Sequence, residues 1–156
     1  MLHIGDPAPD FTLFDTERQA TTLSALKGSK VVLLFFPFAF TSTCTAELCA
    51  TRDDIAFYQN LNAQVFGISV DSPFTLAEFK AQQKLNFPLL SDFNKTVSEA
   101  YDALYETFTM QLLGVSRRAA FVVNEAGNII YAEVLESAGS LPNFEAVKAA
   151  VSSGVA

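Results

Sequence analysis

The chain contains two cysteines and one histidine, which are the side chains with which redox, metal or nucleophilic chemistry could begin. Cys44 and Cys49 are five residues apart, and His3 lies near the N-terminus. These three residues cannot complete a four-ligand zinc site without carboxylates. A histidine so distant in the sequence also gives no signal of a cysteine hydrolase. The two thiols are therefore expected to serve redox catalysis, redox sensing or packing.

Cys44 occupies a position that favours an ionised thiol. It follows the apolar run of residues 31–36 and begins a helical pattern over residues 43–61. The first N–H groups of a helix are unpaired and its dipole is positive there, so both favour the thiolate, which is the reactive form. Thr41 can bring a hydroxyl to the same place, and Pro37 would rigidify the loop and help to exclude water. Two alternatives stay open: Cys44 is an inert core thiol, or Thr41 only caps the helix.

Strand and helix patterns alternate along the chain, which favours an α/β sheet. We expect one domain over residues 1–156, since this length suits a single compact core. Strands are predicted over residues 11–14, 31–36, 65–70, 87–90, 119–123 and 129–134, and helices over residues 43–61, 75–85, 95–101 and 143–151. The last two strands should form a hairpin, because the five residues between them contain Gly127. Residues 106–116 show no clear pattern.

Composition excludes several classes of function. The net charge of −7 disfavours nucleic-acid binding, and no cluster of Lys and Arg offsets it. No run approaches the roughly 18 apolar residues that a membrane span needs. The N-terminal residues lack the features of a signal peptide. We therefore expect a cytoplasmic protein with no nucleic-acid or membrane partner.

The residues around Cys44 resemble the peroxiredoxin motif, in which Pro37, Thr41 and Cys44 have the required spacing. Glu47 also occupies a position familiar in that family. Further similarity covers nearly the whole chain and lies in residues 5–11, 67–72, 87–92 and 118–123. The resemblance implies a thioredoxin-like fold, with a central mixed β-sheet flanked by helices and the N-terminal extension of peroxiredoxins.

The resemblance also implies roles for individual residues. Arg118, rather than Arg117, would face the active site, where a cation favours the thiolate and polarises a peroxide bond. Thr41 and the backbone N–H of Cys44 would hold the hydroperoxide substrate, and attack by sulfur would give a sulfenic acid. No metal or organic cofactor is needed. Glu47 could instead only complement the helix N-terminus.

The spacing of Cys49 resembles that of peroxiredoxin Q-like (bacterioferritin comigratory) proteins. There the second cysteine resolves the sulfenic acid as an intramolecular disulfide, which a thioredoxin-like reductant recycles. Helical residues five apart have Cα atoms roughly 8–9 Å apart, beyond the ~7 Å reach of a disulfide. We therefore expect the first turn or two of this helix to unwind before the bond forms.

Other segments resemble a different subfamily, so the interpretation of turnover stays open. Residues 38–40 and 114–116 are similar to the one-cysteine, alkyl hydroperoxide reductase E-like peroxiredoxins, in which an external thiol would act and Cys49 would be structural. A thiol redox sensor is a third interpretation. A disulfide oxidoreductase is disfavoured, since it would carry Cys-x-x-Cys. Monomer and homodimer both fit the resemblance.

Overall fold

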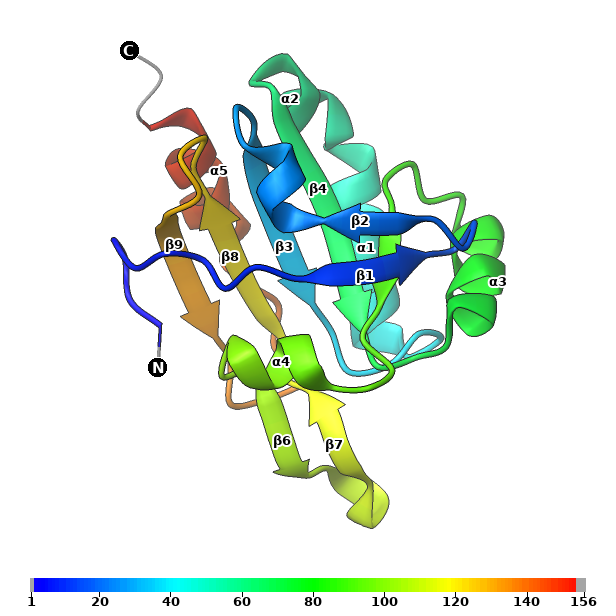
Figure 1. Cartoon of the computed structure of the whole chain (residues 1–156). Helices are drawn as coiled ribbons and strands as arrows, with labels where there is room; N and C mark the ends of the chain where they lie inside the picture. Colours follow the sequence, from blue (N-terminus) through cyan, green and yellow to red (C-terminus); the bar gives the residue numbers. More distant parts are fainter. Residues whose placement is uncertain (1, 154–156) are drawn as a thin grey trace.

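The computed structural model describes residues 2–153, which fold around a mixed seven-stranded sheet (Figure 1). The strand order is β2-β1-β5-β4-β3-β8-β9. The strands are β1 (Thr12–Asp15), β2 (Ala20–Thr22), β3 (Lys30–Phe35), β4 (Ala63–Ser69), β5 (Leu89–Ser91), β8 (Ala119–Val123) and β9 (Ile129–Val134). A separate ladder of β6 (Leu104–Thr107) and β7 (Leu113–Ser116) projects from the body.

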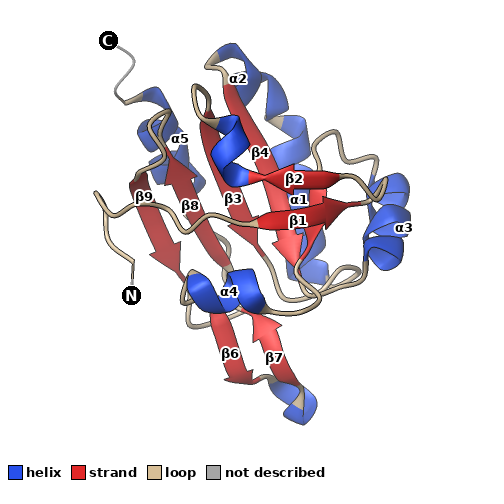
Figure 2. Ribbon diagram, in the orientation of Figure 1, coloured by secondary structure: helices blue, strands red, loops and turns tan. Residues whose placement is uncertain are grey.

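Helices cover both faces of the sheet (Figure 2). They are α1 (Ser42–Asp53), α2 (Ile55–Asn60), α3 (Pro73–Gln83), α4 (Thr96–Ala100) and α5 (Phe144–Ser152), with short 3-10 helices at Leu23–Leu26 and Thr109–Gln111. Helices α1, α2, α3 and α5 pack on one face, and α4 packs on the other together with residues of β1. None of the helices in residues 2–153 is long and apolar enough to cross a membrane.

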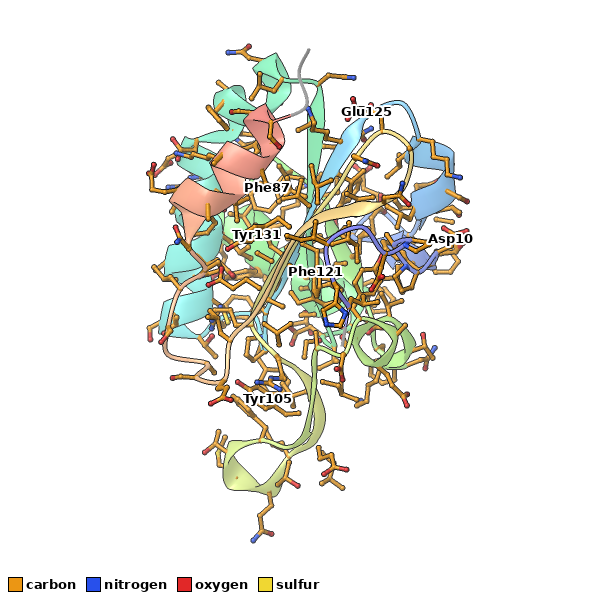
Figure 3. The ribbon with its side chains drawn as sticks, turned by 90° about the vertical axis from the view of Figure 1, so that its left-hand side faces the viewer. Asp10, Phe87, Tyr105, Phe121, Glu125 and Tyr131 are labelled. Atoms are coloured by element: carbon orange, nitrogen blue, oxygen red, sulfur yellow. The ribbon has the colours of Figure 1, made fainter. Side chains whose placement is uncertain are left out.

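The central strand β3 is buried along its whole length. Its side chains alternate between the two layers, so that Leu34 packs with the α1 face and Phe35 packs with the α4 face. Phe121 of β8 lies in the interior (Figure 3), where its ring meets Phe35 edge to face at 5.7 Å. A strand covered on both faces favours apolar residues on both sides, which explains the continuous apolar run that follows Lys30 in β3.

Several sequence predictions are confirmed. The β8–β9 hairpin has the predicted bounds, and its turn is fixed by Asn124, whose side chain accepts hydrogen bonds from the N–H groups of Ala126 and Asn128. Helix α3 forms where the sequence indicates, but it begins two residues earlier than predicted. Ser72 caps it by accepting from the N–H of Thr75, and the proline occupies the first turn.

The single helix predicted over residues 43–61 is wrong, because the chain forms two helices there. Asp54 separates α1 from α2 with φ −103° and ψ 9°. Its carboxylate pairs with Lys148 of α5. The sequence carries neither Gly nor Pro near this point, and a break supported by a distant ion pair leaves no local signal.

The β6–β7 hairpin and the short strand β2 are absent from the sequence prediction. The tip of the hairpin reverses through Met110 and Gln111, which have φ values of 59° and 60°. Neither residue is the Gly, Asn or Asp that usually marks such a turn. The hairpin also stands away from the main core. Burial therefore imposes no regular alternation of apolar and polar residues on its sequence.

The sheet register brings two distant segments together. β3 and β8 are antiparallel, with Phe35 opposite Ala119. Arg118, directly before β8, therefore lies beside the segment that leaves β3 and leads to α1. β3 pairs with β4 on one side and with β8 on the other. These pairings, rather than the local sequence, thus decide which residues surround the start of α1.

The first prediction concerns Gly67, which lets β4 pass close beneath this segment. A Cβ at Gly67 would lie 2.7 Å from Leu89 Cδ2 and 3.3 Å from Phe36 Cε1. Both neighbours are fully buried, so Gly67→Ala should lower the free energy of unfolding by about 1–3 kcal/mol. Urea denaturation measures this change.

The matched control is Gly139→Ala, where the nearest atom to the new Cβ is Ser137 Oγ at 3.6 Å. It should change the free energy of unfolding by less than about 0.5 kcal/mol. Equal effects of the two substitutions would contradict the steric argument for Gly67.

Candidate active site

The loop between β3 and α1 is anchored by Asp71, which follows β4. The Asp71 carboxylate accepts hydrogen bonds from the N–H of Ala39 at 2.8 Å and the hydroxyl of Ser69 at 2.7 Å. Burial raises the pKa of Asp71, and these hydrogen bonds oppose the rise. Asp71 is not among the residues that the sequence pattern predicts. A usable signal was its place after a buried strand, since parallel strands end at the same edge of a sheet.

The residues just before α1 have an unusual backbone. Phe40 has a φ of 69°, which is uncommon for a bulky residue and marks local strain. Thr41 occupies the N-cap position, but its side chain makes no capping hydrogen bond. Its hydroxyl instead donates to the carbonyl of Phe38 at 3.0 Å. The capping interpretation of Thr41 is therefore wrong, and its oxygen keeps lone pairs that can accept a hydrogen bond.

Cys44 lies in the first turn of α1 and is fully buried. Its Sγ accepts a hydrogen bond from Arg118 Nη2 at 3.2 Å. Pro37, also buried, lies in the preceding loop. The structure thus brings together the thiol and the arginine that the sequence predicts as site residues.

Only 1% of the surface of Arg118 is exposed, and hydrogen bonds hold its guanidinium on several sides. Nε and Nη2 donate to the carbonyl of Ala138 at 3.1 and 2.8 Å, and Nη1 donates to Glu47 Oε2 at 3.2 Å. A planar guanidinium can serve these partners at once, which a lysine could not. The cation is therefore fixed in direction as well as in place.

Arg117 points elsewhere, as the sequence prediction requires. Its guanidinium donates to the carbonyl of Leu135 at 3.3–3.4 Å and lies 5.5 Å from the ring of Tyr105. Tyr105 belongs to β6 at the base of the projecting hairpin (Figure 3). Arg117 thus supports the hairpin, and Arg118 reaches the thiol.

Glu47 is fully buried one turn after Cys44. Burial raises the pKa of Glu47 to about 8, although the nearby charge of Arg118 and its hydrogen bond oppose the rise. The second carboxyl oxygen, Oε1, has no hydrogen-bond partner within residues 2–153. Glu47 therefore does more than complement a helix terminus, because it pairs directly with the active-site cation.

Cys49 lies farther along the same intact helix and is half-buried, and both cysteines are free thiols. Its Sγ lies 3.5 Å from Gln83 Oε1 at the end of α3. Arg52 binds the Gln83 carbonyl at 2.6 Å, and Asn86 donates to the Arg52 carbonyl at 3.2 Å. This half of α1 is therefore tied to α3, whereas the half that carries Cys44 begins without a side-chain cap.

Aromatic side chains of the loop before α1 pack on neighbouring elements. The rings of Phe38 and Phe108 lie 6.0 Å apart and join the active-site loop to the β6–β7 hairpin. Phe40 packs on Phe79 of α3 at 5.2 Å and stays 49% exposed. These rings add apolar surface near the active-site loop. A buried charge there has few partners other than the side chains of Arg118 and Glu47.

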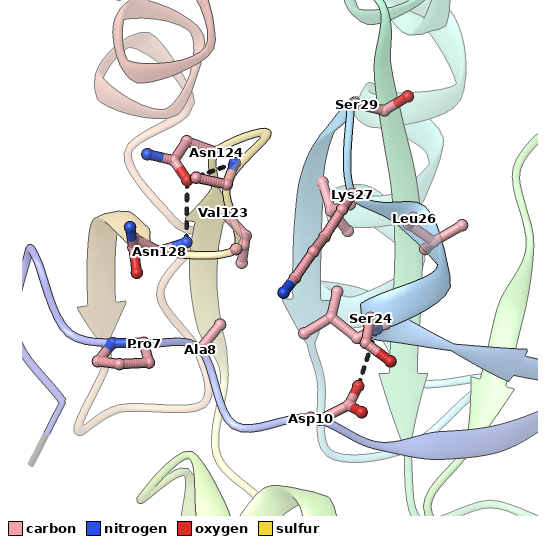
Figure 4. Close-up of a pocket in the computed structure, with 14 residues that line it drawn as sticks. Pro7, Ala8, Asp10, Ser24, Leu26, Lys27, Ser29, Val123, Asn124 and Asn128 are labelled. Atoms are coloured by element: carbon pink, nitrogen blue, oxygen red, sulfur yellow. Dashed lines mark hydrogen bonds between the residues drawn. The ribbon is translucent and has the colours of Figure 1, made fainter.

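A cavity of about 400 Å³ lies at the far end of the sheet, where Lys27 extends toward the β8–β9 turn (Figure 4). Asp10 borders it and accepts from the N–H of Ser24 at 2.8 Å. Hydrogen bonds from Ser24 hold the pKa of Asp10 below its usual value. This cavity adjoins the start of β3, whereas Cys44 lies beyond the end of β3. The cavity therefore does not belong to the thiol site.

Comparison with known proteins agrees with this geometry. The AhpC/TSA family model matches residues 4–132. The chain belongs to the AhpC/TSA family. Among the relatives of this AhpC/TSA protein, alkyl hydroperoxide reductase E of Mycobacterium tuberculosis is 41% identical over 137 residues, which cover 86% of each chain. A putative peroxiredoxin, bcp, of Haemophilus influenzae is 37% identical over 130 residues, which cover 83% of this chain and 84% of the relative.

Solved structures show the same peroxiredoxin fold. Peroxidoxin BcpB from Mycobacterium tuberculosis matches with a TM-score of 0.85 and 28% identity, covering 97% of both chains. A cysteine-to-serine mutant of PrxQ from Xylella fastidiosa matches with a TM-score of 0.85 and 26% identity, covering 96% of this chain and 94% of that chain. The predicted thioredoxin-like fold, with a mixed sheet flanked by helices, is confirmed.

The second prediction tests the coupling of Arg118 to Glu47. Arg118→Met should lower the free energy of unfolding by about 1–3 kcal/mol, because it leaves the buried Glu47 carboxyl and the Ala138 carbonyl without their hydrogen-bond donor. Adding Glu47→Gln to that variant should cost less than about 1 kcal/mol further, since the hydrogen bond between the two side chains is already lost. Urea denaturation of the two single variants and the double variant measures the coupling, and additive costs would show that the pair is independent.

The third prediction concerns the anchor of the loop. Asp71→Ala removes the acceptor of the Ala39 N–H and should lower the free energy of unfolding by about 1–3 kcal/mol. Amide hydrogen exchange should show faster exchange at Ala39 and the residues beside it than in the native chain. Unchanged protection there would mean that the hydrogen bond from Ala39 to Asp71 does not hold the loop.

Proposed function

We propose that this peroxiredoxin reduces hydrogen peroxide and organic hydroperoxides with Cys44 as the nucleophile. The observation that carries the proposal is the 3.2 Å contact between Arg118 Nη2 and Cys44 Sγ at the start of a helix. A fixed cation and the helix N-terminus both favour the thiolate in a site otherwise closed to water.

The reaction is a displacement at oxygen. The thiolate of Cys44 attacks one peroxide oxygen, so that an S–O bond forms while the O–O bond breaks. The other oxygen takes up a proton and leaves as water or an alcohol, and Cys44 becomes a sulfenic acid. Arg118 stabilises the charge that develops on the oxygens.

Thr41, Pro37 and the backbone of Cys44 would position the substrate. Because the Thr41 hydroxyl donates to Phe38, its oxygen is suited to accept a hydrogen bond from the peroxide O–H. The N–H of Cys44 would donate to the other oxygen. Cys44 has no exposed surface, so even a small peroxide requires a local movement of the loop, and Pro37 limits the entry of water.

Turnover would use Cys49 as the resolving thiol. Its sulfur would attack the sulfenic sulfur, releasing water and forming an intramolecular disulfide that a thiol reductant, such as a thioredoxin-like protein, returns to two thiols. Closing this bond requires α1 to unwind and the contact between Cys49 and Gln83 to break.

A second cycle has its own support, since Cys49 is tied to α3 at the far half of an intact helix. In that cycle an external thiol attacks the sulfenic acid and Cys49 stays a structural thiol. The resemblance of residues 38–40 and 114–116 to the one-cysteine subfamily also favours this alternative.

The fourth prediction separates these cycles. One equivalent of hydrogen peroxide is added to the reduced protein, and free thiols and intact mass are measured for the native chain, Cys44→Ser and Cys49→Ser. The proposal expects fast loss of both thiols with a mass decrease of about 2 Da, abolished in either variant. A gain of about 16 Da with Cys49 still free would establish the one-cysteine cycle. The absence of a fast reaction at Cys44 would refute the peroxidase function.

A further inference from the structure

The guanidinium of Arg118 is divided between two acidic groups on one helix. Nη2 contacts Cys44 Sγ and Nη1 contacts Glu47 Oε2, each at 3.2 Å. Both acids are fully buried, and Arg118 itself is 1% exposed. One positive charge therefore faces two groups that can each become negative.

Ionising both acids at once is unfavourable in such a place. Two like charges that share a buried site raise the free energy of the doubly ionised state, so one guanidinium cannot stabilise both anions as well as it stabilises one. The neutral backbone carbonyl of Ala138 is the remaining acceptor of the Arg118 hydrogen bonds in the described chain, and it adds no positive charge to balance a second anion.

The surroundings of Glu47 favour its neutral form. Its Oε1 has no hydrogen-bond partner within residues 2–153, and an unpartnered oxygen of a buried carboxylate is costly. Burial raises the pKa of Glu47 to about 8. In the described part of the chain, Arg118 is the charged group that faces Glu47 from outside α1, and Cys44 on α1 is the ionisable group that shares Arg118 with Glu47.

We propose that Glu47 is a positioning residue that controls how much of the Arg118 charge acts on Cys44. As a neutral acid it leaves the guanidinium to the thiolate and to the bound peroxide. As a carboxylate, after losing its proton to solvent, it draws the guanidinium toward itself and weakens the hydrogen bond to sulfur. The site is thus most reactive while Glu47 is protonated, an inference that rests on the proposed peroxidase function.

The fifth prediction is a pH profile of the first oxidation step. In a Cys49→Ser background, which confines oxidation to Cys44, the second-order rate constant with hydrogen peroxide is measured by stopped flow between about pH 5 and pH 9.5. As the pH rises through the region of Glu47 ionisation, the rate constant should fall by about threefold or more, because the thiolate loses part of its cation. Glu47→Gln cannot ionise and should abolish this alkaline fall.

The matched control is Asp53→Asn, which removes an exposed negative charge from the end of the same helix. It should keep the alkaline fall of the background protein. A merely structural role of Glu47 would scale the rate constant equally at every pH and leave the shape of the profile unchanged.

Three results would overturn the inference while leaving the peroxidase function intact. These are an alkaline fall that persists in Glu47→Gln, the absence of any fall in the background protein, and a rate constant of Glu47→Gln that is depressed at every pH to a similar degree. Failure of Cys44 to react in every variant and at every pH would instead overturn the proposed function and this inference with it.

Discussion

A buried cation governs the arrangement of this active site. An arginine removed from water must have its charge balanced and its N–H groups bonded, or it destabilises the fold by several kcal/mol. Arg118 meets this demand through one carbonyl, one carboxyl group and one sulfur. The first turns of α1 and the turn at Ala138 must therefore both close on the guanidinium. The same demand makes the sulfur of Cys44 a hydrogen-bond acceptor for the cation, although Cys44 also packs within the core.

The pairing of strands in the sheet, rather than the local sequence, brings these residues together. Antiparallel pairing of β3 with β8 places Arg118 beside the chain that leaves β3. Parallel pairing of β3 with β4 brings Asp71 to the same edge, where it binds the N–H of Ala39. Gly67 keeps the ring of Phe36 close to β4. Strand register, rather than any flexible loop, thus sets the relative positions of thiol and cation.

Reactivity and turnover make opposite demands on α1. A helix that begins at an uncapped N-terminus concentrates positive potential at Cys44, but a disulfide to Cys49 cannot close across an intact helix. The strained backbone of Phe40 and the missing cap at Thr41 weaken the start of α1. Its far half is tied to α3 through Gln83. The reduced fold is thus best prepared to open at the end that carries Cys44, the proposed nucleophile.

The sequence by itself determined the α/β class, the central buried strands, the β8–β9 hairpin and the local motif of Pro37, Thr41 and Cys44. These features are local: a strand covered on both faces must be apolar throughout, a helix start has characteristic residues, and a motif is a spacing along the chain. Resemblance to a family added Arg118, which no local pattern links to a cysteine 74 residues away.

Only the tertiary structure decided the break at Asp54, the β6–β7 hairpin, the anchoring role of Asp71 and the burial of Glu47. Each depends on groups that are distant in the sequence, such as the ion pair with Lys148 or the N–H of Ala39. The ionisation of Glu47 is the clearest case. A glutamate in the first half of a helix is ordinarily a solvated carboxylate, and it becomes a group with a raised pKa only because the packed fold buries it, an effect that the charge of Arg118 opposes.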